Sequence, residues 1–148
     1  MRILLGLALV GLALGCGDSS DDQWTKDRPA VADAEGVVLY NNEPVEGATV
    51  VFAPAGGKHA ASGLTDSSGR FSVSAFPNSE GAVPGSYKVT VTKLETPVAA
   101  GGGDGHGESV TAPPKNLLPS KYAETSQTPL TAEVPESGKT DFEFQLAD

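Results

Sequence analysis

The chain has 148 residues, which suits one domain and is short for two. It carries 19 acidic and 10 basic side chains, and its formal net charge of -9 argues against nucleic acid as a partner, because phosphate binding needs a basic surface. One cysteine excludes an intramolecular disulfide and a zinc site built from several thiolates. With 39% hydrophobic residues the chain is too apolar to be wholly disordered.

Residues 1–15 are predicted to be a signal peptide. Arg2 precedes an apolar run from Ile3 to Leu14. About 12 residues of helix would cover only about 18 Å of the roughly 30 Å hydrocarbon core, so a membrane-spanning helix is disfavoured. The polar, acidic stretch 17–22 argues against a buried core helix. The pattern favours a cleaved secretory signal.

Cys16 lies where the apolar run ends, directly after the small residue Gly15. These residues resemble the lipobox of bacterial lipoproteins, although Ala13 stands where that family prefers leucine. The resemblance implies that the Cys16 sulfur receives a diacylglyceryl group and that cleavage before Cys16 leaves an acylated N-terminus. The alternative is ordinary secretion with an unmodified thiol. The expected localisation is the cell envelope, lipid-anchored and facing the periplasm or the exterior.

Residues 16–33 are predicted to form a disordered tether, because they contain five aspartates and little apolar periodicity. As a coil, this segment would span roughly 20–25 Å. Trp24 is its one large aromatic residue, and it is expected to rest at the membrane interface, to dock on the domain or simply to be exposed. Calcium binding by Asp18, Asp21 and Asp22 is less favoured than solvation, because no dense alternating aspartate loop occurs.

Residues 34–148 are predicted to be one domain of short strands, because apolar positions alternate and no helical period persists. Strands are expected at 37–40, 49–52, 60–65, 70–75, 87–92, 130–134 and 141–146. Turns are expected at 41–43, 66–69, 81–85 and 136–139. About seven strands with such turn spacing predict an all-β, antiparallel sandwich.

Two regions interrupt the alternation. Residues 94–114 include a glycine-rich stretch that cannot bury apolar surface, so they are predicted to be a mobile loop. Residues 115–128 are predicted to be a one-turn helix or ordered coil over a sheet edge, where they would cover unpaired backbone groups.

Four stretches together resemble the carboxypeptidase regulatory-like domain, namely Gly36–Val38, Glu43–Phe52, Thr65–Phe71 and Pro84–Val89. The resemblance implies a single transthyretin-like Greek-key β-sandwich. Leu118–Tyr122 and Asp141–Phe144 are similar to the C-terminal part of small bacterial lipoproteins built on this domain. The motif residues that shape turns are expected to make the fold and not to catalyse a reaction: Pro44, Gly47, Asp66, Gly69, Pro84 and Gly85.

Enzyme chemistry is not expected from the remaining candidates. Enzymes that carry this domain use a separate zinc peptidase domain, for which this chain has no room and no His-x-x-Glu element. Asp104, His106 and Glu108 occupy alternate positions that could ligate a metal, but ordering their loop would cost about 1–2 kcal/mol per residue. A solvated loop is therefore favoured. His59 has no recognisable nucleophile turn beside it.

Two further resemblances are weaker. The sandwich is similar to transthyretin-related hydroxyisourate hydrolases, but those end in tyrosine-arginine-glycine-serine, whereas this chain ends in Gln145–Asp148. Pilin-type sandwiches join lysine to asparagine beside an acid, and Lys93 and Glu95 have no such asparagine near the end of the last strand. No catalytic residue, cofactor or metal is therefore expected.

The favoured hypothesis is a non-enzymatic, lipid-anchored envelope protein whose sandwich makes structural contacts or binds a protein. Its partners would be the membrane, through the lipid on Cys16, and an envelope protein or polysaccharide. The alternative is a binder of carbohydrate or another cell-surface polymer, which would use exposed aromatic residues in a row on one sheet face. A small hydrolase or metal-binding protein is a third hypothesis.

Overall fold

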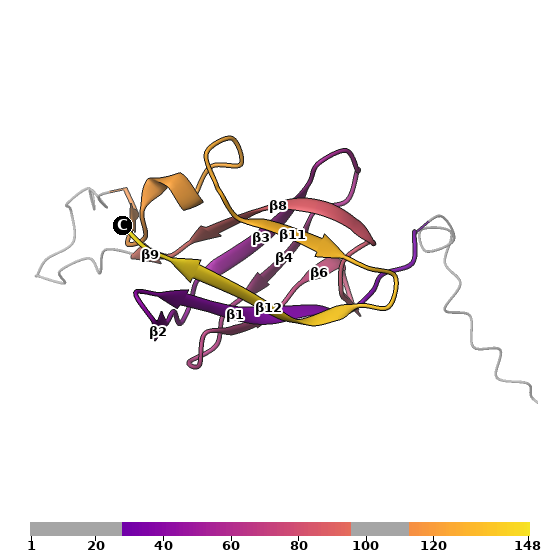
Figure 1. The fold of residues 1–148 in the computed structure, drawn as a ribbon, viewed down its shortest axis with the longest axis horizontal. Helices are drawn as coiled ribbons and strands as arrows, with labels where there is room; N and C mark the ends of the chain where they lie inside the picture. Colours follow the sequence, from indigo (N-terminus) through magenta and orange to yellow (C-terminus); the bar gives the residue numbers. More distant parts are fainter. Residues whose placement is uncertain (1–27, 96–112) are drawn as a thin grey trace, which may run out of the picture.

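The structure is a computed structural model that describes residues 28–95 and 113–148, and it is all-β (Figure 1). The expectations for Cys16, Trp24, Asp104, His106 and Glu108 lie outside the described residues. The strands are β1 (Ala34–Tyr40), β2 (Glu43–Pro44), β3 (Thr49–Pro54), β4 (Ala61–Leu64), β5 (Arg70–Ser72), β6 (Ser74–Phe76), β7 (Ser79–Glu80), β8 (Gly85–Thr92), β9 (Leu94–Glu95), β10 (Lys115–Asn116), β11 (Thr131–Val134) and β12 (Lys139–Leu146). A 3-10 turn, η1 (Ser120–Tyr122), precedes β11.

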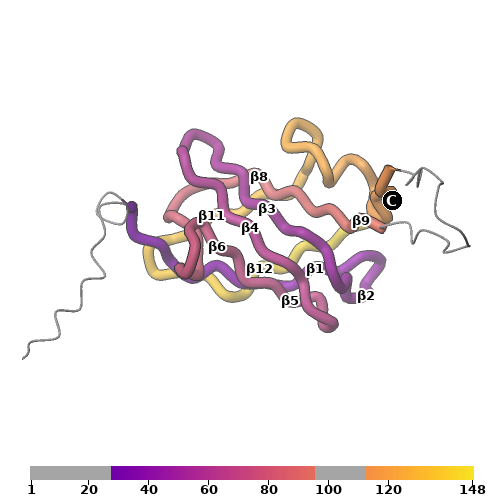
Figure 2. The backbone as a smooth tube through the Cα atoms, turned by 180° about the vertical axis from the view of Figure 1, so that it is seen from behind, coloured from indigo at the N-terminus to yellow at the C-terminus, as the bar shows by residue number. Residues whose placement is uncertain are grey.

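Two sheets face each other as a β-sandwich, which confirms the expected architecture. One sheet has the order β12-β1-β2, with β5 also paired to β1. The other has the order β11-β8-β3-β4-β6-β7. Figure 2, which views the molecule from the side opposite to Figure 1, labels β3 and β4 of this sheet. The short ladder β9–β10 continues from the end of β8.

The expected antiparallel arrangement is wrong for one pair of strands, because β1 and β12 run parallel. Ala34 lies opposite Lys139, and Tyr40 lies opposite Leu146. Both strands start at the same end of the sandwich, where the Lys139 amide donates to the Asp33 carbonyl at 2.7 Å. A parallel pair needs a long connection, and nearly the whole domain lies between these two strands.

The single strand expected at 70–75 is divided between the two sheets. β5 pairs with β1, whereas β6 pairs with β4. Val73 lies at the crossing, where its amide donates to the Ala34 carbonyl at 3.1 Å and its side chain is 1% exposed. Strands commonly change sheets in this way at the corner of a sandwich.

The core is built around Phe52, which is 0% exposed. Its ring centroid lies 5.6 to 6.1 Å from the ring centroids of Phe71, Tyr87, Phe142 and Phe144, the separations of favourable aromatic pairs. Nearly all of the side chains expected to face inward are buried, namely Phe71, Val73, Tyr87, Val89, Val91, Phe142, Phe144 and Leu146, while Ala75 is half-buried.

Some boundaries differ from the expectation. Ala32 was assigned to the tether, but it is buried and exchanges two hydrogen bonds with Ala82. Leu94 and Glu95 were assigned to the mobile loop, but they form β9. The helical turn expected within 115–128 is η1, where the Tyr122 hydroxyl both donates to the carbonyl and accepts from the amide of Ala147. These hydrogen bonds bring all three segments into the folded domain.

The sandwich has two distinct ends (Figure 1). At the proximal end, which we define by Ala32, Ala82 and Gly138, the described chain enters the fold. At the distal end lie the turn between β1 and β2, the β9–β10 ladder and the C-terminus. Within residues 28–95 and 113–148, no helix has the length and apolar character needed to cross a membrane.

Candidate functional site

The proximal end carries a surface hollow of about 290 Å³, which we call the proximal hollow. Two segments line it, residues 54–59, which begin with the last residue of β3, and residues 83–87, which run into β8. The Ala55 amide donates to the Ser86 carbonyl at 3.0 Å and holds the two segments together. The hollow therefore exists because β3 and β8 are neighbours in the sheet and their ends diverge into separate loops.

The lining of the proximal hollow is apolar with a cationic side. Pro54, Pro84 and Tyr87 supply apolar faces, and the ionisable groups along the 54–59 segment are Lys58 and His59. No carboxylate lies among the lining residues of this described site. The Tyr87 hydroxyl donates to the Val83 carbonyl, and burial raises the pKa of Tyr87, so this phenol stays neutral at physiological pH.

The Gly56–His59 loop presents backbone donors at the rim of the hollow. Within the part of the chain that the structure describes, the amides of residues 56 to 59 donate to no protein acceptor. Gly56 and Gly57 are exposed, and a Cβ built on Gly56 would meet nothing within 4 Å. These donors therefore face water and remain open to an incoming acceptor.

His59 is positioned by aromatic contact and not by a catalytic network. Its ring lies 5.1 Å from the Phe76 ring in an edge arrangement, and the Arg28 guanidinium lies 5.4 Å from the centroid of the same Phe76 ring. Among the described residues His59 hydrogen-bonds to no serine and no carboxylate. This arrangement gives His59 a place at the mouth of a hollow without an activated nucleophile beside it.

A second hollow of about 260 Å³ adjoins the first over β8 and β11, and we call it the β8–β11 hollow. The two hollows share Ala55, Ser86 and Tyr87. The β8–β11 hollow adds Lys88 and Glu133, whose strands pair in this sheet. The two hollows are therefore neighbours, the first lined by the cationic Lys58 and the second by Lys88 and Glu133, which have opposite charges.

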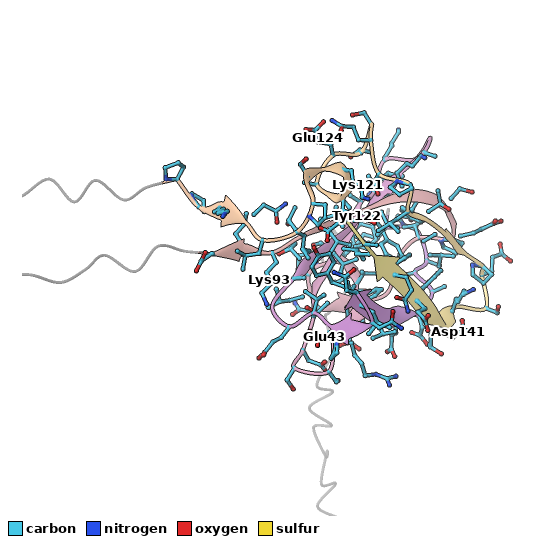
Figure 3. All side chains as sticks on the ribbon, turned by 60° about the vertical axis from the view of Figure 1, so that its left-hand side comes forward. Glu43, Lys93, Lys121, Tyr122, Glu124 and Asp141 are labelled. Atoms are coloured by element: carbon cyan, nitrogen blue, oxygen red, sulfur yellow. The ribbon has the colours of Figure 1, made fainter. Side chains whose placement is uncertain are left out.

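The distal end has a smaller hollow of about 180 Å³, and its lining residues include Glu43 and Lys93. Figure 3 labels both of these side chains. Leu117 lines it and is 44% exposed, and Leu94 on the neighbouring β9 is 57% exposed. Lys93 was a candidate for a covalent link beside Glu95. The structure places the Lys93 side chain at this hollow with Glu43 and puts Glu95 on β9.

The described residues contain no cluster of side chains that could bind a metal ion. Within residues 28–95 and 113–148, no three side chains of histidine, cysteine, aspartate or glutamate gather as a metal site. Asp104, His106 and Glu108 are outside these ranges, so the hypothesis that they ligate a metal is not tested by the structure. Cys16, the expected lipid-attachment residue, is outside them as well.

The proximal hollow has no signature in the local sequence. Residues 81–85 are predicted to be a turn, and the strand predicted at 49–52 stops at Pro54. Neither signal indicated that these two segments meet, because they come together only through the pairing of β3 with β8. Of the lining residues, His59 is weighed as a catalytic candidate, whereas Pro84 and Gly85 are expected to shape the fold.

Comparisons with known proteins leave the chain without an assigned family. No protein-family model and no curated protein matches it. Among solved structures it is similar to a 9R-lipoxygenase from Cyanothece PCC8801, at 14% sequence identity and a TM-score of 0.37. The match covers 80% of this chain and 16% of the lipoxygenase chain.

Proposed function

We propose that the protein is a non-enzymatic lipoprotein of the cell envelope, held by acyl chains on Cys16 and presenting a β-sandwich that binds another protein. The observation that carries the proposal is the apolar run that ends at Gly15-Cys16, in the resemblance to a lipobox, ahead of a compact sandwich. Two or three acyl chains would anchor the protein stably, because each buried methylene contributes about 0.8 kcal/mol. The net charge of -9 would not assist binding to anionic lipid.

The geometry of the fold supports a defined orientation of the sandwich relative to the membrane. The described chain enters at the proximal end, and the dozen or so residues between Cys16 and Arg28 reach at most about 40 Å when extended. The proximal end would therefore stay near the lipid surface, while the distal end with Leu94 and Leu117 would point away from it.

The placement of polar side chains supports a binding module over an enzyme. Among the residues that the structure describes, the buried polar ones are Thr65, Thr90 and Thr128. Thr65 accepts a hydrogen bond from the Ala48 amide, and Thr128 donates one to the Val89 carbonyl. The hydroxyls of Thr65 and Thr128 therefore join segments of the backbone, which is a role in the fold and not in catalysis.

The use of aromatic residues favours protein binding over the carbohydrate alternative. Sugar binding would use a row of exposed rings, whereas Phe52, Phe71, Tyr87, Tyr122, Phe142 and Phe144 are buried in the described domain. Tyr40 and Phe76 are half-buried and lie on different strands. The half-buried prolines and the backbone donors of the proximal hollow suit a peptide better than a sugar ring.

Cys16→Ser tests the anchor. We expect the wild-type protein in the membrane fraction with an intact mass raised by acyl groups, and the variant in the soluble fraction, because the thiol is the attachment point. Ser20→Ala, four residues further along, is the matched control and should fractionate as wild type. A variant that stays wholly in the membrane fraction, or a mature wild-type chain with an unmodified thiol, would contradict the anchor.

A further inference from the structure

We propose that the proximal hollow and the adjoining β8–β11 hollow bind the free carboxylate end of an extended peptide. The inference deepens the protein-binding part of the proposed function and rests on that part, but it does not depend on the lipid anchor. Four features of the described residues carry it: the charge of the hollow, its backbone donors, its apolar faces and its continuation over β8 and β11.

The charge of the proximal hollow is opposite to that of the molecule. Lys58 brings a positive charge to a hollow without a lining carboxylate, on a chain with a net charge of -9. The ion pair found in the described part of the chain is Lys139 with Asp141, at 3.7 Å, so Lys58 has no carboxylate partner there. A carboxylate is the natural ligand for such an ammonium group, because a charge-assisted hydrogen bond is about twice as strong as a neutral one.

The loop beside Lys58 adds donors that a carboxylate can use. The amides of residues 56 to 59 follow one another at the rim and have no protein acceptor in the described chain. Consecutive backbone amides capture terminal carboxylates in known modes of peptide recognition. Cβ atoms built on Gly56 and on Gly85 would meet nothing within 4 Å, so the ligand could approach the backbone on both sides of the hollow.

The apolar faces specify the residue that carries the carboxylate. Pro54, Pro84 and Tyr87 form the sides of a hollow of about 290 Å³, which is near the lower limit of small-ligand pockets. Such a hollow suits one terminal residue with an apolar side chain. It also disfavours a highly charged inorganic anion, which would lose hydration against proline rings.

The β8–β11 hollow favours a peptide over a lone carboxylate. It shares Ala55, Ser86 and Tyr87 with the proximal hollow and offers an ammonium on Lys88 and a carboxylate on Glu133. A peptide backbone carries donors and acceptors along its length and can satisfy both. The residues that precede the terminal one would therefore lie over β8 and β11.

Fluorescence anisotropy on the full mature chain in detergent tests the inference. The probe is an N-terminally labelled pentapeptide of alanine and threonine that ends in valine, compared with the same peptide amidated at its C-terminus. We expect the free acid to bind at least about tenfold more tightly, the size of one charge-assisted hydrogen bond. Lys58→Gln should lower the affinity for the free-acid peptide by about tenfold. Lys115→Gln, on the distal β10, should leave that affinity unchanged.

Several outcomes would overturn the inference. One is that the free-acid and amidated peptides bind with equal affinity. Another is that Lys58→Gln and Lys115→Gln lose the same amount of affinity for the free acid. A third is that neither peptide binds at millimolar concentration. Competition by N-acetylvaline as strong as that of the pentapeptide would show a site for small carboxylates and no peptide subsite. The Cys16→Ser chain is expected to bind the peptide as wild type does, so a failed anchor and a failed peptide site are told apart.

Discussion

Two loops of this sandwich treat their backbone amides in opposite ways. In the Asp66–Gly69 loop, one Asp66 carboxylate oxygen accepts from the amides of Ser68 and Arg70 at 2.8 and 2.9 Å, and the Gly69 amide donates to the Asp66 carbonyl. In the loop at Gly56–His59, the described chain offers no acceptor for the amides. A loop with an internal acceptor closes on itself, whereas a loop without one presents its donors to solvent or ligand.

The difference extends to packing. Gly69 is buried, with a φ of 73°, and a Cβ there would lie 2.6 Å from the Val38 carbonyl oxygen. Gly56 is exposed with open space around it. We infer that the Asp66–Gly69 loop serves the fold and that the Gly56–His59 loop is available for binding, and the following experiments test this contrast.

The largest effect is expected for Gly69→Ala. Alanine at this position would have to adopt the left-handed conformation of Gly69, and its methyl group would clash with the Val38 carbonyl oxygen. The free energy of unfolding should therefore fall by about 2–4 kcal/mol. Urea denaturation followed by tyrosine fluorescence measures the change.

Gly56→Ala is the matched control for this substitution. It should change the free energy of unfolding by less than about 1 kcal/mol, and in the stabilising direction, because alanine has less unfolded-state entropy and meets no neighbour. Equal losses in the two variants would mean that both loops are structural and would remove the contrast.

A smaller effect, dependent on pH, is expected for Asp66→Asn. Hydrogen bonds from the Ser68 hydroxyl and then from the Arg70 amide hold the pKa of Asp66 below its ordinary value of 3.8. The folded-state pKa therefore lies below that of the unfolded chain. The stability that this carboxylate contributes is fully present above the unfolded-state value and is lost as the pH falls through the folded-state pKa.

Unfolding midpoints of wild type and Asp66→Asn should therefore differ at pH 7 and converge as the pH is lowered below about 4. Glu46→Gln is a suitable control, since it removes an exposed carboxylate elsewhere on the surface. A difference between wild type and Asp66→Asn that is constant from pH 7 to pH 3 would show that the carboxylate charge is not what closes the loop.

The smallest effect on stability is expected for Lys58→Gln. Its side chain is exposed and has no ion-pair partner in the described chain, so the free energy of unfolding should stay within about 0.5 kcal/mol of wild type. Thermal denaturation of the variant measures this directly. A clear destabilisation would assign Lys58 to the fold, and any loss of peptide binding in that variant would then have a structural cause.

Local sequence was sufficient for the parts of the fold that depend on near neighbours. Asn41 and Asn42 were predicted to make a turn, and they adopt φ angles of 50° and 69° between β1 and β2, as a two-residue hairpin requires. Asp66 and Gly69 were likewise predicted to form a tight turn from their own chemistry. The site was less accessible, because Lys58 and Pro84 are far apart in the chain and carry no shared motif.

The sequence by itself determined which side chains face the core, because a period of two fixes the inward set of each strand regardless of its partner. Only the tertiary structure decided that β12 lies parallel to β1, that the chain changes sheets at Val73, and that residues 54–59 meet residues 83–87. Pairings between distant strands depend on how the inner faces of the two sheets pack around Phe52. The free energy of that packing comes from residues far apart in the chain, so no local sequence pattern determines it.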